Sequence, residues 1–322
     1  MIRSGPLFVV GAPRSGTTLL LESLNRHPAL WLCNETYFLH FVYGRRRRLG
    51  DLADPVCRRR LVQAYLKTKR IRQQEVDPER LAQRLMAEAT GYRELFTSLM
   101  RFCAEENGRP RFGEKTPDHA RSATTLCDLY PECALIHLVR DPRDVVASLR
   151  RMPWGDRSLL GNVRQWEACT RGALACSDRP AYLRVRYEDL IREPEATLTR
   201  IVSFVGLEYS AQMLDPSEGA GAQRWWLERA RGALDSTRLG RWREELEPRE
   251  VALIEHVSGP AMEALGYDRS GGSPSAGALL AARAAEVVDR IRRRIRRVPG
   301  MWIYWTRPAD LAAEERTLEA LA

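Results

Sequence analysis

Short apolar runs alternate along this chain with longer stretches in which apolar residues recur every three or four positions. The apolar runs lie at 7–10, 29–33 and 134–139, while 182–186 alternates as a strand does and 111–115 is expected to be the end of a further strand. Short runs of this kind are typical of strands, whereas the wider spacing is typical of helices that bury one face. Alternation of the two predicts an α/β fold, with a parallel β-sheet flanked by helices on both faces.

The longer stretches predict the positions of several helices. Helical spacing predicts helices over 15–26, 91–107 and 120–130, and helices that begin at Asp77-Pro78 and at Pro194. Proline suits the first turn of a helix, because the N–H that it lacks has no partner there. The stretch between the second predicted strand and Lys115 is therefore expected to form a helical insert.

The first predicted strand leads into a loop bounded by two glycines, Gly11-Ala-Pro-Arg-Ser-Gly-Thr-Thr18, and the loop leads into a helix. Glycines allow the backbone to approach a ligand, and a helix start presents unpaired N–H groups and a positive dipole end. The spacing is nearly that of the phosphate-binding P-loop, but Thr17 stands at the lysine position. The loop therefore predicts an anion site, with Arg14 as the nearest cation.

A second strand–turn–helix unit carries another candidate phosphate site. The strand 134–139 leads into Arg140-Asp-Pro-Arg-Asp-Val-Val-Ala-Ser148, with Pro142 at the expected helix start. A guanidinium at Arg140 and a hydroxyl at Ser148 can bind one phosphate together. Two such units predict a nucleotide that carries phosphates at two separate places.

These motifs resemble those of the sulfotransferase family that uses 3′-phosphoadenosine-5′-phosphosulfate (PAPS). Pro13–Thr18 resembles the family's 5′-phosphosulfate loop, and Arg140–Ser148 resembles its 3′-phosphate motif. Arg186-Tyr-Glu-Asp-Leu190 and Glu114-Lys-Thr-Pro117 resemble the segments that bring a tyrosine to adenine and a lysine to the sulfate. The resemblance extends over roughly residues 5–268, and two ordered motifs are more specific than one.

Within the family the chain resembles the tyrosylprotein and carbohydrate branches. In the tyrosylprotein branch a glutamate followed by threonine at this distance from the loop is the catalytic base, and Glu35-Thr36 falls on that position. The chain departs from that branch at Asn34, where the branch has a second glutamate. The late glycine-rich element of the family is matched in altered form by residues 235–242.

The resemblance implies roles for individual residues. Glu35, Lys115 and Arg14 are expected to be catalytic, and the residues expected to bind the nucleotide are Arg14, Ser15, Gly16, Thr17, Thr18, Arg140, Ser148, Tyr187 and Ser236. PAPS would be the donor and adenosine 3′,5′-bisphosphate (PAP) the product, with no metal. The acceptor would be a hydroxyl of a sugar, a small-molecule metabolite or a peptide tyrosine.

Other interpretations remain open at the level of sequence. His119 is a rival base, because histidine is the commonest proton acceptor near neutral pH. A P-loop kinase or NTPase, and a nucleotide-binding scaffold without catalysis, are the alternative functions. Thr17 at the lysine position disfavours the first, and the presence of both Glu35 and Lys115 disfavours the second. Trp225, Trp226 and Trp242 are expected to serve packing.

Composition narrows the class of partner. The chain has 322 residues and a formal net charge of +9, which favours anionic partners but does not by itself indicate nucleic acid. The four arginines at 45–48 are expected to form a solvated loop, or a segment that closes over an acidic substrate. Seven cysteines without a paired spacing predict reduced thiols. With no signal or spanning segment apparent, we expect a cytoplasmic bacterial enzyme.

The C-terminal part is expected to be separate from the catalytic domain, residues 1–268. Residues 269–277 read as a flexible linker, and 278–322 as a basic helical tail. One apolar stripe of the tail comprises Leu280, Ala284, Val287, Ile291, Ile295 and Val298, and residues 281–297 include seven arginines. With the aromatic cluster at 301–305, the pattern permits a membrane or dimer contact through 278–305, or a tail helix packed on the enzyme.

Overall fold

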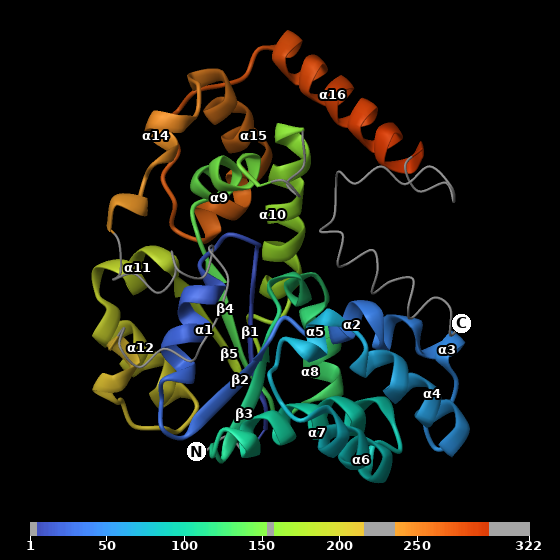
Figure 1. Ribbon diagram of the computed structural model, residues 1–322. Coiled ribbons are helices and arrows are strands. Elements are labelled where there is room, and N and C mark those ends of the chain that lie inside the picture. The colour runs from blue at the N-terminus through green and yellow to red at the C-terminus, as the bar shows by residue number, and fades with distance from the viewer. Residues whose placement is uncertain (1–4, 153–157, 216–235, 296–322) are drawn as a thin grey trace.

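A sheet of five parallel strands forms the centre of the molecule (Figure 1). The computed structural model describes residues 5–152, 158–215 and 236–295. The strands are β1 (Leu7–Gly11), β2 (Leu30–Asn34), β3 (Arg111–Lys115), β4 (Ala134–Val139) and β5 (Tyr182–Arg186), in the spatial order β2-β3-β1-β4-β5. Because every pair is parallel, all five carboxyl ends lie along one edge. The predicted α/β fold is confirmed.

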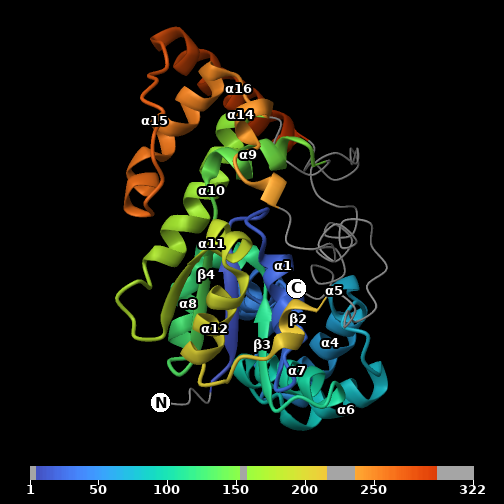
Figure 2. The ribbon, with the colours of Figure 1, turned by 90° about the vertical axis from the view of Figure 1, so that its left-hand side faces the viewer.

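Helices cover both faces of the sheet, as Figures 1 and 2 show. Phe8 and Val10 of β1 pack in one hydrophobic core with α7 (Tyr92–Glu106), α8 (Ala123–Leu129) and α10 (Leu159–Leu174). Leu7 and Val9 pack in a second core with α1 (Thr17–Asn25) and α12 (Pro194–Phe204). Alternate residues of a strand point to opposite faces, so a central strand covered on both sides must be apolar throughout.

A helical insert separates β2 from β3. It contains α2 (Phe38–Phe41), the 3₁₀ turn η1 (Tyr43–Arg45), α3 (Arg46–Leu49), α4 (Pro55–Leu66), α5 (Lys69–Arg72), α6 (Pro78–Glu88) and α7. The predicted start at Asp77-Pro78 is confirmed, because the Asp77 carboxylate accepts the N–H groups of Glu79 and Arg80. The run 45–48, expected as a loop, instead lies in η1 and α3, which Gly50 ends at a φ of 90°.

The remaining elements follow β3, β4 and β5 in the chain. They are η2 (Pro117–Ser122), α9 (Pro142–Arg150), α11 (Tyr187–Arg192), η3 (Ala211–Leu214), η4 (Ser236–Arg238), α14 (Trp242–Glu245), α15 (Pro248–Ala264) and α16 (Ala276–Ile295). The helix predicted over 120–130 is divided, because η2 occupies its first turn and α8 begins only at Ala123.

The C-terminal helices lie beyond the carboxyl edge of the sheet. α15 packs against α9 and α10, and Val251 and Ile254 share a third core with Val146 and Val163. In the expected linker, the backbone N–H of Ser270 donates to the Glu255 carboxylate at 2.9 Å. No helix among the described ranges is both long and apolar enough to span a bilayer.

Candidate active site

The loop after β1 has the backbone of an anion-binding turn. Arg14 and Gly16 have positive φ values of 73° and 93°, and Gly16 immediately precedes α1. The aromatic ring of Tyr187 lies against Gly16, since a Cβ added at this glycine would stand 2.3 Å from Tyr187 Cδ2. Only glycine meets both conditions without strain. The Ser15 hydroxyl is buried and has no hydrogen-bond partner among the described residues, so a ligand oxygen could fill that role.

Three predicted nucleotide-binding residues from distant parts of the chain meet at this loop. Arg14 Nε donates to Ser148 Oγ at 3.1 Å, and Arg140 Nη1 donates to the Arg14 carbonyl at 3.2 Å. Burial lowers the pKa of Arg14, and the positive charge of Arg140 lowers it further. Like charges held together at one loop are expected where a bound anion offsets their repulsion. The Arg140 Nε, buried without a partner in the described chain, adds a free donor.

Tyr187 connects this cluster to the strand β5. The Arg140 guanidinium carbon lies 4.3 Å from the centre of the Tyr187 ring, in a cation–π contact. Tyr187 begins α11 directly after β5, and burial raises the pKa of its hydroxyl. The indole N–H of Trp166 donates to the Arg140 carbonyl at 3.0 Å and so holds the backbone at the end of β4 in place.

The late element, residues 236–242, docks on the same cluster through its backbone. Arg140 Nη2 donates to the Arg238 carbonyl at 2.7 Å. The Asp144 carboxylate accepts the N–H groups of Gly240 and Trp242 at 2.9 and 3.0 Å. Ser236 itself is exposed in η4, so it is Arg238 that reaches Arg140. Trp242 is buried in the third core. Trp225 and Trp226 lie outside the described residues.

The predicted base and lysine lie in direct contact at the ends of β2 and β3. Lys115 Nζ donates to Glu35 Oε1 at 3.0 Å and lies 3.4 Å from Thr18 Oγ1 in the first turn of α1. The Lys115 side chain is fully buried, whereas 26% of the Glu35 side chain is exposed. Glu35 has a φ of 49°, and its N–H donates to the Lys115 carbonyl at 2.6 Å. A strained backbone of this kind is typical of functional sites.

A residue that the sequence did not indicate holds the other oxygen of Glu35. Arg70 Nη1 of α5 donates to Glu35 Oε2 at 3.2 Å, and its guanidinium carbon lies 4.6 Å from the centre of the Tyr37 ring. Gln74 Nε2 donates to the Arg70 carbonyl at 2.7 Å and fixes the short helix. Arg70 is one of many cations between residues 43 and 72, and nothing in the sequence separates it from Lys69 or Arg72.

The rival base His119 is enclosed by the protein. Its Nε2 accepts the N–H of Leu39 at 3.3 Å, and its Nδ1 lies 3.2 Å from Glu114 Oε2. Glu114 Oε1 in turn accepts the N–H and hydroxyl of Thr36 at 3.0 and 2.9 Å. The His119–Glu114 pair therefore supports the turn that carries Glu35. Among the described residues, no cluster of three or more His, Cys, Asp or Glu could hold a metal ion.

Comparisons with known proteins identify the family. The model of the Sulfotransferase family matches residues 6–211. Protein-tyrosine sulfotransferase A of Caenorhabditis elegans is 24% identical over 291 residues, covering 85% of this chain and 70% of that protein. Carbohydrate sulfotransferase 7 of Mus musculus is 39% identical over 108 residues, covering 32% of this chain and 22% of that protein.

A solved structure shares the fold. The sulfotransferase domain from the Synechococcus PCC 7002 olefin synthase superimposes with a TM-score of 0.61 at 23% sequence identity, covering 83% of this chain and 96% of that one. The family match spans the loop after β1, Glu35, Lys115 and the Arg140–Ser148 unit, and it favours sulfuryl transfer over the kinase and scaffold alternatives. The chain is an enzyme of the sulfotransferase family.

Proposed function

We propose that this site transfers a sulfuryl group from PAPS to an acceptor hydroxyl, with Glu35 as the base. The observation that carries the proposal is the Lys115 ammonium, which lies between Glu35 Oε1 and Thr18 Oγ1 at 3.0 and 3.4 Å. A single buried cation thus joins the proposed base to the proposed donor loop. Transfer requires the base, the reacting groups and the charge-stabilising donors within such distances of one another.

The residues around the loop suit the two ends of the donor. The N–H groups at the start of α1, the Ser15 hydroxyl and Arg14 would bind the 5′-phosphosulfate. Arg140 and Ser148 would bind the 3′-phosphate, since Arg140 keeps a buried donor without a protein partner. We assign Tyr187, against Gly16 and under Arg140, to the adenine side of the nucleotide. For Ser236 the proposal concerns only its segment, residues 236–242, because the contact with Arg140 is made by the Arg238 carbonyl.

The reaction moves one proton and one sulfuryl group. Glu35 takes the proton from the acceptor hydroxyl, whose oxygen forms a bond to sulfur while the bond from sulfur to the phosphate oxygen breaks and PAP leaves. Lys115 and Arg14 offset the negative charge that develops on the leaving oxygen and the sulfuryl oxygens. Arg70 keeps Oε2 of Glu35 in place, so the carboxylate presents a fixed face to the acceptor.

Glu35 suits the role of base better than His119. Part of the Glu35 side chain reaches solvent, where an acceptor can approach, whereas His119 is buried with both ring nitrogens facing protein groups. A general base must come within hydrogen-bond distance of the proton that it takes. To accept a proton from an acceptor, His119 would first have to give up the N–H of Leu39 or the Glu114 carboxylate.

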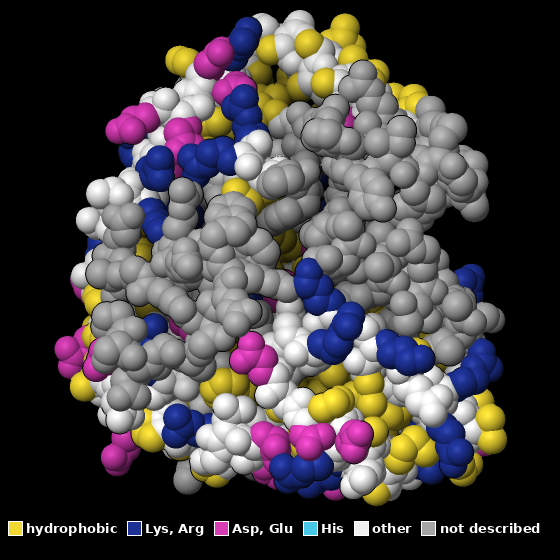
Figure 3. Space-filling model, in the orientation of Figure 1, with side chains coloured by type: hydrophobic (Ala, Val, Ile, Leu, Met, Phe, Trp, Pro, Cys, Tyr) yellow, Lys and Arg dark blue, Asp and Glu magenta, His cyan; other side chains and the backbone are white. Residues whose placement is uncertain are grey.

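The helical insert is where we place acceptor recognition. Residues 43–72 contain eleven arginines and lysines against two aspartates, and Lys and Arg side chains gather over the region of α2 to α5 (Figure 3). A positive surface beside the base favours an acceptor that carries negative charge. The relatives are named for tyrosine and carbohydrate acceptors. A hydroxyl of an acidic sugar or peptide, rather than nucleic acid, is therefore the acceptor class we propose.

We also propose that the enzyme works in a reducing compartment, the bacterial cytoplasm. All seven cysteines are free, and six of them are buried. The sulfur atoms of Cys127 and Cys176 lie 3.7 Å apart without a bond between them. Thiols this close tend to oxidise in secreted proteins, so their free state favours a reducing environment.

The test of the assignment compares Glu35→Gln with His119→Gln. Glu35→Gln is expected to lower kcat by about 10²- to 10⁴-fold and to leave PAP affinity within about twofold, because only proton transfer is removed. His119→Gln is expected to lower the melting temperature of the enzyme. Its kcat, measured on the folded fraction, is expected to change little. If His119→Gln removes turnover from a stable enzyme and Glu35→Gln does not, the base is misassigned.

A further inference from the structure

The last described helix lies on the enzyme with its polar side inward. Glu286 and Asp289 of α16 are only 6% and 5% exposed, and Arg164 of α10 pairs with Glu286 at 2.9 Å. On the opposite side, Leu280, Val287 and Ile291 are 72%, 48% and 52% exposed. These three positions share one side of a helix, since they are seven and eleven residues apart. The apolar stripe therefore faces away from the enzyme, the reverse of an ordinary surface helix.

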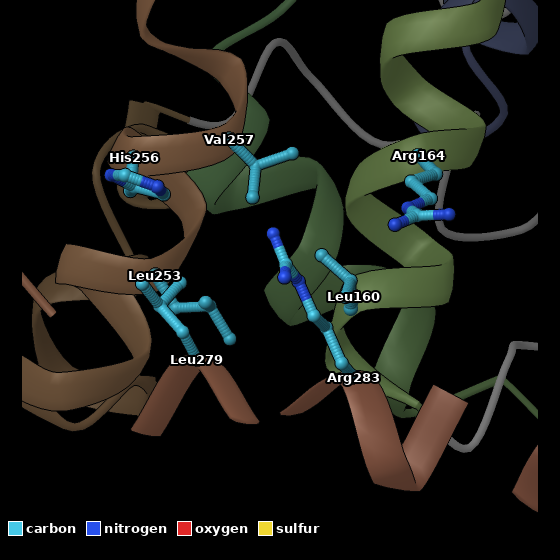
Figure 4. Close-up of a pocket in the computed structure, with 7 residues that line it drawn as sticks. All are labelled: Leu160, Arg164, Leu253, His256, Val257, Leu279 and Arg283. Carbon is cyan, nitrogen blue, oxygen red and sulfur yellow. The ribbon is translucent and has the colours of Figure 1, made fainter. Parts of the chain in front are cut away.

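Packing beneath α16 is incomplete. A partly open pocket of about 150 Å³ lies between α16, α10 and α15, with Leu160, Leu253, Leu279 and Arg283 in its wall (Figure 4). α16 contacts α10 and α15 around this pocket. Its exposed apolar stripe lies on another side of the helix and remains available to another surface.

The charges around the stripe favour a particular occupant. Residues 281–297 include seven arginines, and the two acidic residues of this stretch, Glu286 and Asp289, are buried, Glu286 in a pair with Arg164 of α10. A second copy of the stripe would bring two arginine-rich helices together, which their like charges oppose. An apolar stripe on a segment whose sequence has seven arginines against two acidic residues suits an anionic lipid surface instead.

We propose that α16 is an interfacial helix that seats the enzyme on an anionic membrane surface. Its apolar stripe would lie among the upper acyl chains, and its arginines would contact the phosphates of the lipid headgroups. The Arg164–Glu286 pair would hold the catalytic region against the other side of the helix. The proposal is independent of the donor, the acceptor and the base.

Vesicle flotation of the full chain tests the proposal. Vesicles of phosphatidylcholine alone and of an equal mixture with phosphatidylglycerol serve as probes. The wild type is expected to float with the anionic vesicles, at least tenfold more than with the neutral ones, and less at high salt. The double variant Val287→Glu/Ile291→Glu is expected to lose at least about tenfold in binding, because two apolar side chains can no longer enter the lipid.

A matched control keeps the test specific. Val56 of α4 is 69% exposed outside the stripe, so Val56→Glu makes the same type of substitution at one exposed apolar position and should leave vesicle binding unchanged. Circular dichroism checks that each variant is folded, and this measurement does not depend on donor binding. A folded wild type that binds neither vesicle overturns the proposal. The proposal is also overturned if Val56→Glu reduces vesicle binding as much as the double variant does. It is overturned as well if the stripe mediates a dimer that does not bind vesicles.

Discussion

The ammonium of Lys115 lies 3.0 Å from Glu35 Oε1 and 3.4 Å from Thr18 Oγ1. Glu35 follows β2 and Lys115 is the last residue of the neighbouring strand β3. Thr18 lies in the helix that follows β1, the strand on the other side of β3. The parallel order of the sheet thus brings the proposed base, its cation and the proposed donor loop to one edge, where ligands of such sheets bind. The predictions below test separate parts of this arrangement.

Lys115→Met should remove charge stabilisation without removing the donor site. We expect kcat to fall by about 10²- to 10³-fold, as for loss of one preorganised donor in a buried site. PAP binding should change much less, because PAP lacks the sulfuryl group. Steady-state kinetics and calorimetry measure the two effects. Lys67→Met, an exposed lysine of the same insert, is the control, and equal losses in both variants would contradict the assignment.

Arg140→Ala should weaken PAP far more than adenosine 5′-phosphate, which lacks the 3′-phosphate. A charge-assisted hydrogen bond contributes about 1.5–3 kcal/mol, so we expect roughly a 10- to 100-fold loss for PAP. Titration of both nucleotides measures the difference. Arg150→Ala, at the end of α9 and paired at the surface with Glu250, should leave both affinities unchanged. A similar loss for both nucleotides in Arg140→Ala would rule out a specific role at the 3′-phosphate.

Gly16→Ala should disturb the donor loop itself. The residue has a φ of 93°, and the new Cβ would stand 2.3 Å from the Tyr187 ring. We expect a destabilisation of at least about 1 kcal/mol and loss of PAP binding, measured by thermal unfolding and titration. Gly277→Ala in α16, where no atom lies within 4 Å of the added Cβ, should be neutral or slightly stabilising. Normal PAP binding by Gly16→Ala would show that the loop tolerates a side chain.

Arg70→Gln should act on turnover and not on the donor. Loss of the bond to Glu35 Oε2 leaves the carboxylate free to rotate, so we expect kcat to fall about tenfold with PAP affinity unchanged. Arg70→Lys should restore part of the rate, because it keeps a charge near Oε2. Arg72→Gln, an exposed neighbour on α5, is the control. A normal kcat in Arg70→Gln would show that Lys115 alone is sufficient to orient Glu35.

Sequence patterns predicted the parts of the fold that depend on local chemistry. The strands 134–139 and 182–186 have the predicted bounds, since apolar runs and proline starts are local signals. Arg70 was not predicted, because its role depends on the packing of α5 beside β2 and not on any neighbour in sequence. The apolar stripe of α16 could be recognised from the spacing of its residues. Which side of the helix faces the enzyme could not, because it depends on the Arg164–Glu286 pair between distant parts of the chain.

The direct test of the central claim is calorimetric titration of the purified protein with PAP in the absence of metal, beside ATP with magnesium. The donor site described above predicts tight binding of PAP alone, at one site per chain, and weak or no binding of ATP with magnesium. Binding of ATP with magnesium but not of PAP would contradict the account, because the arginine cluster at Arg14 and Arg140 would then serve a different nucleotide.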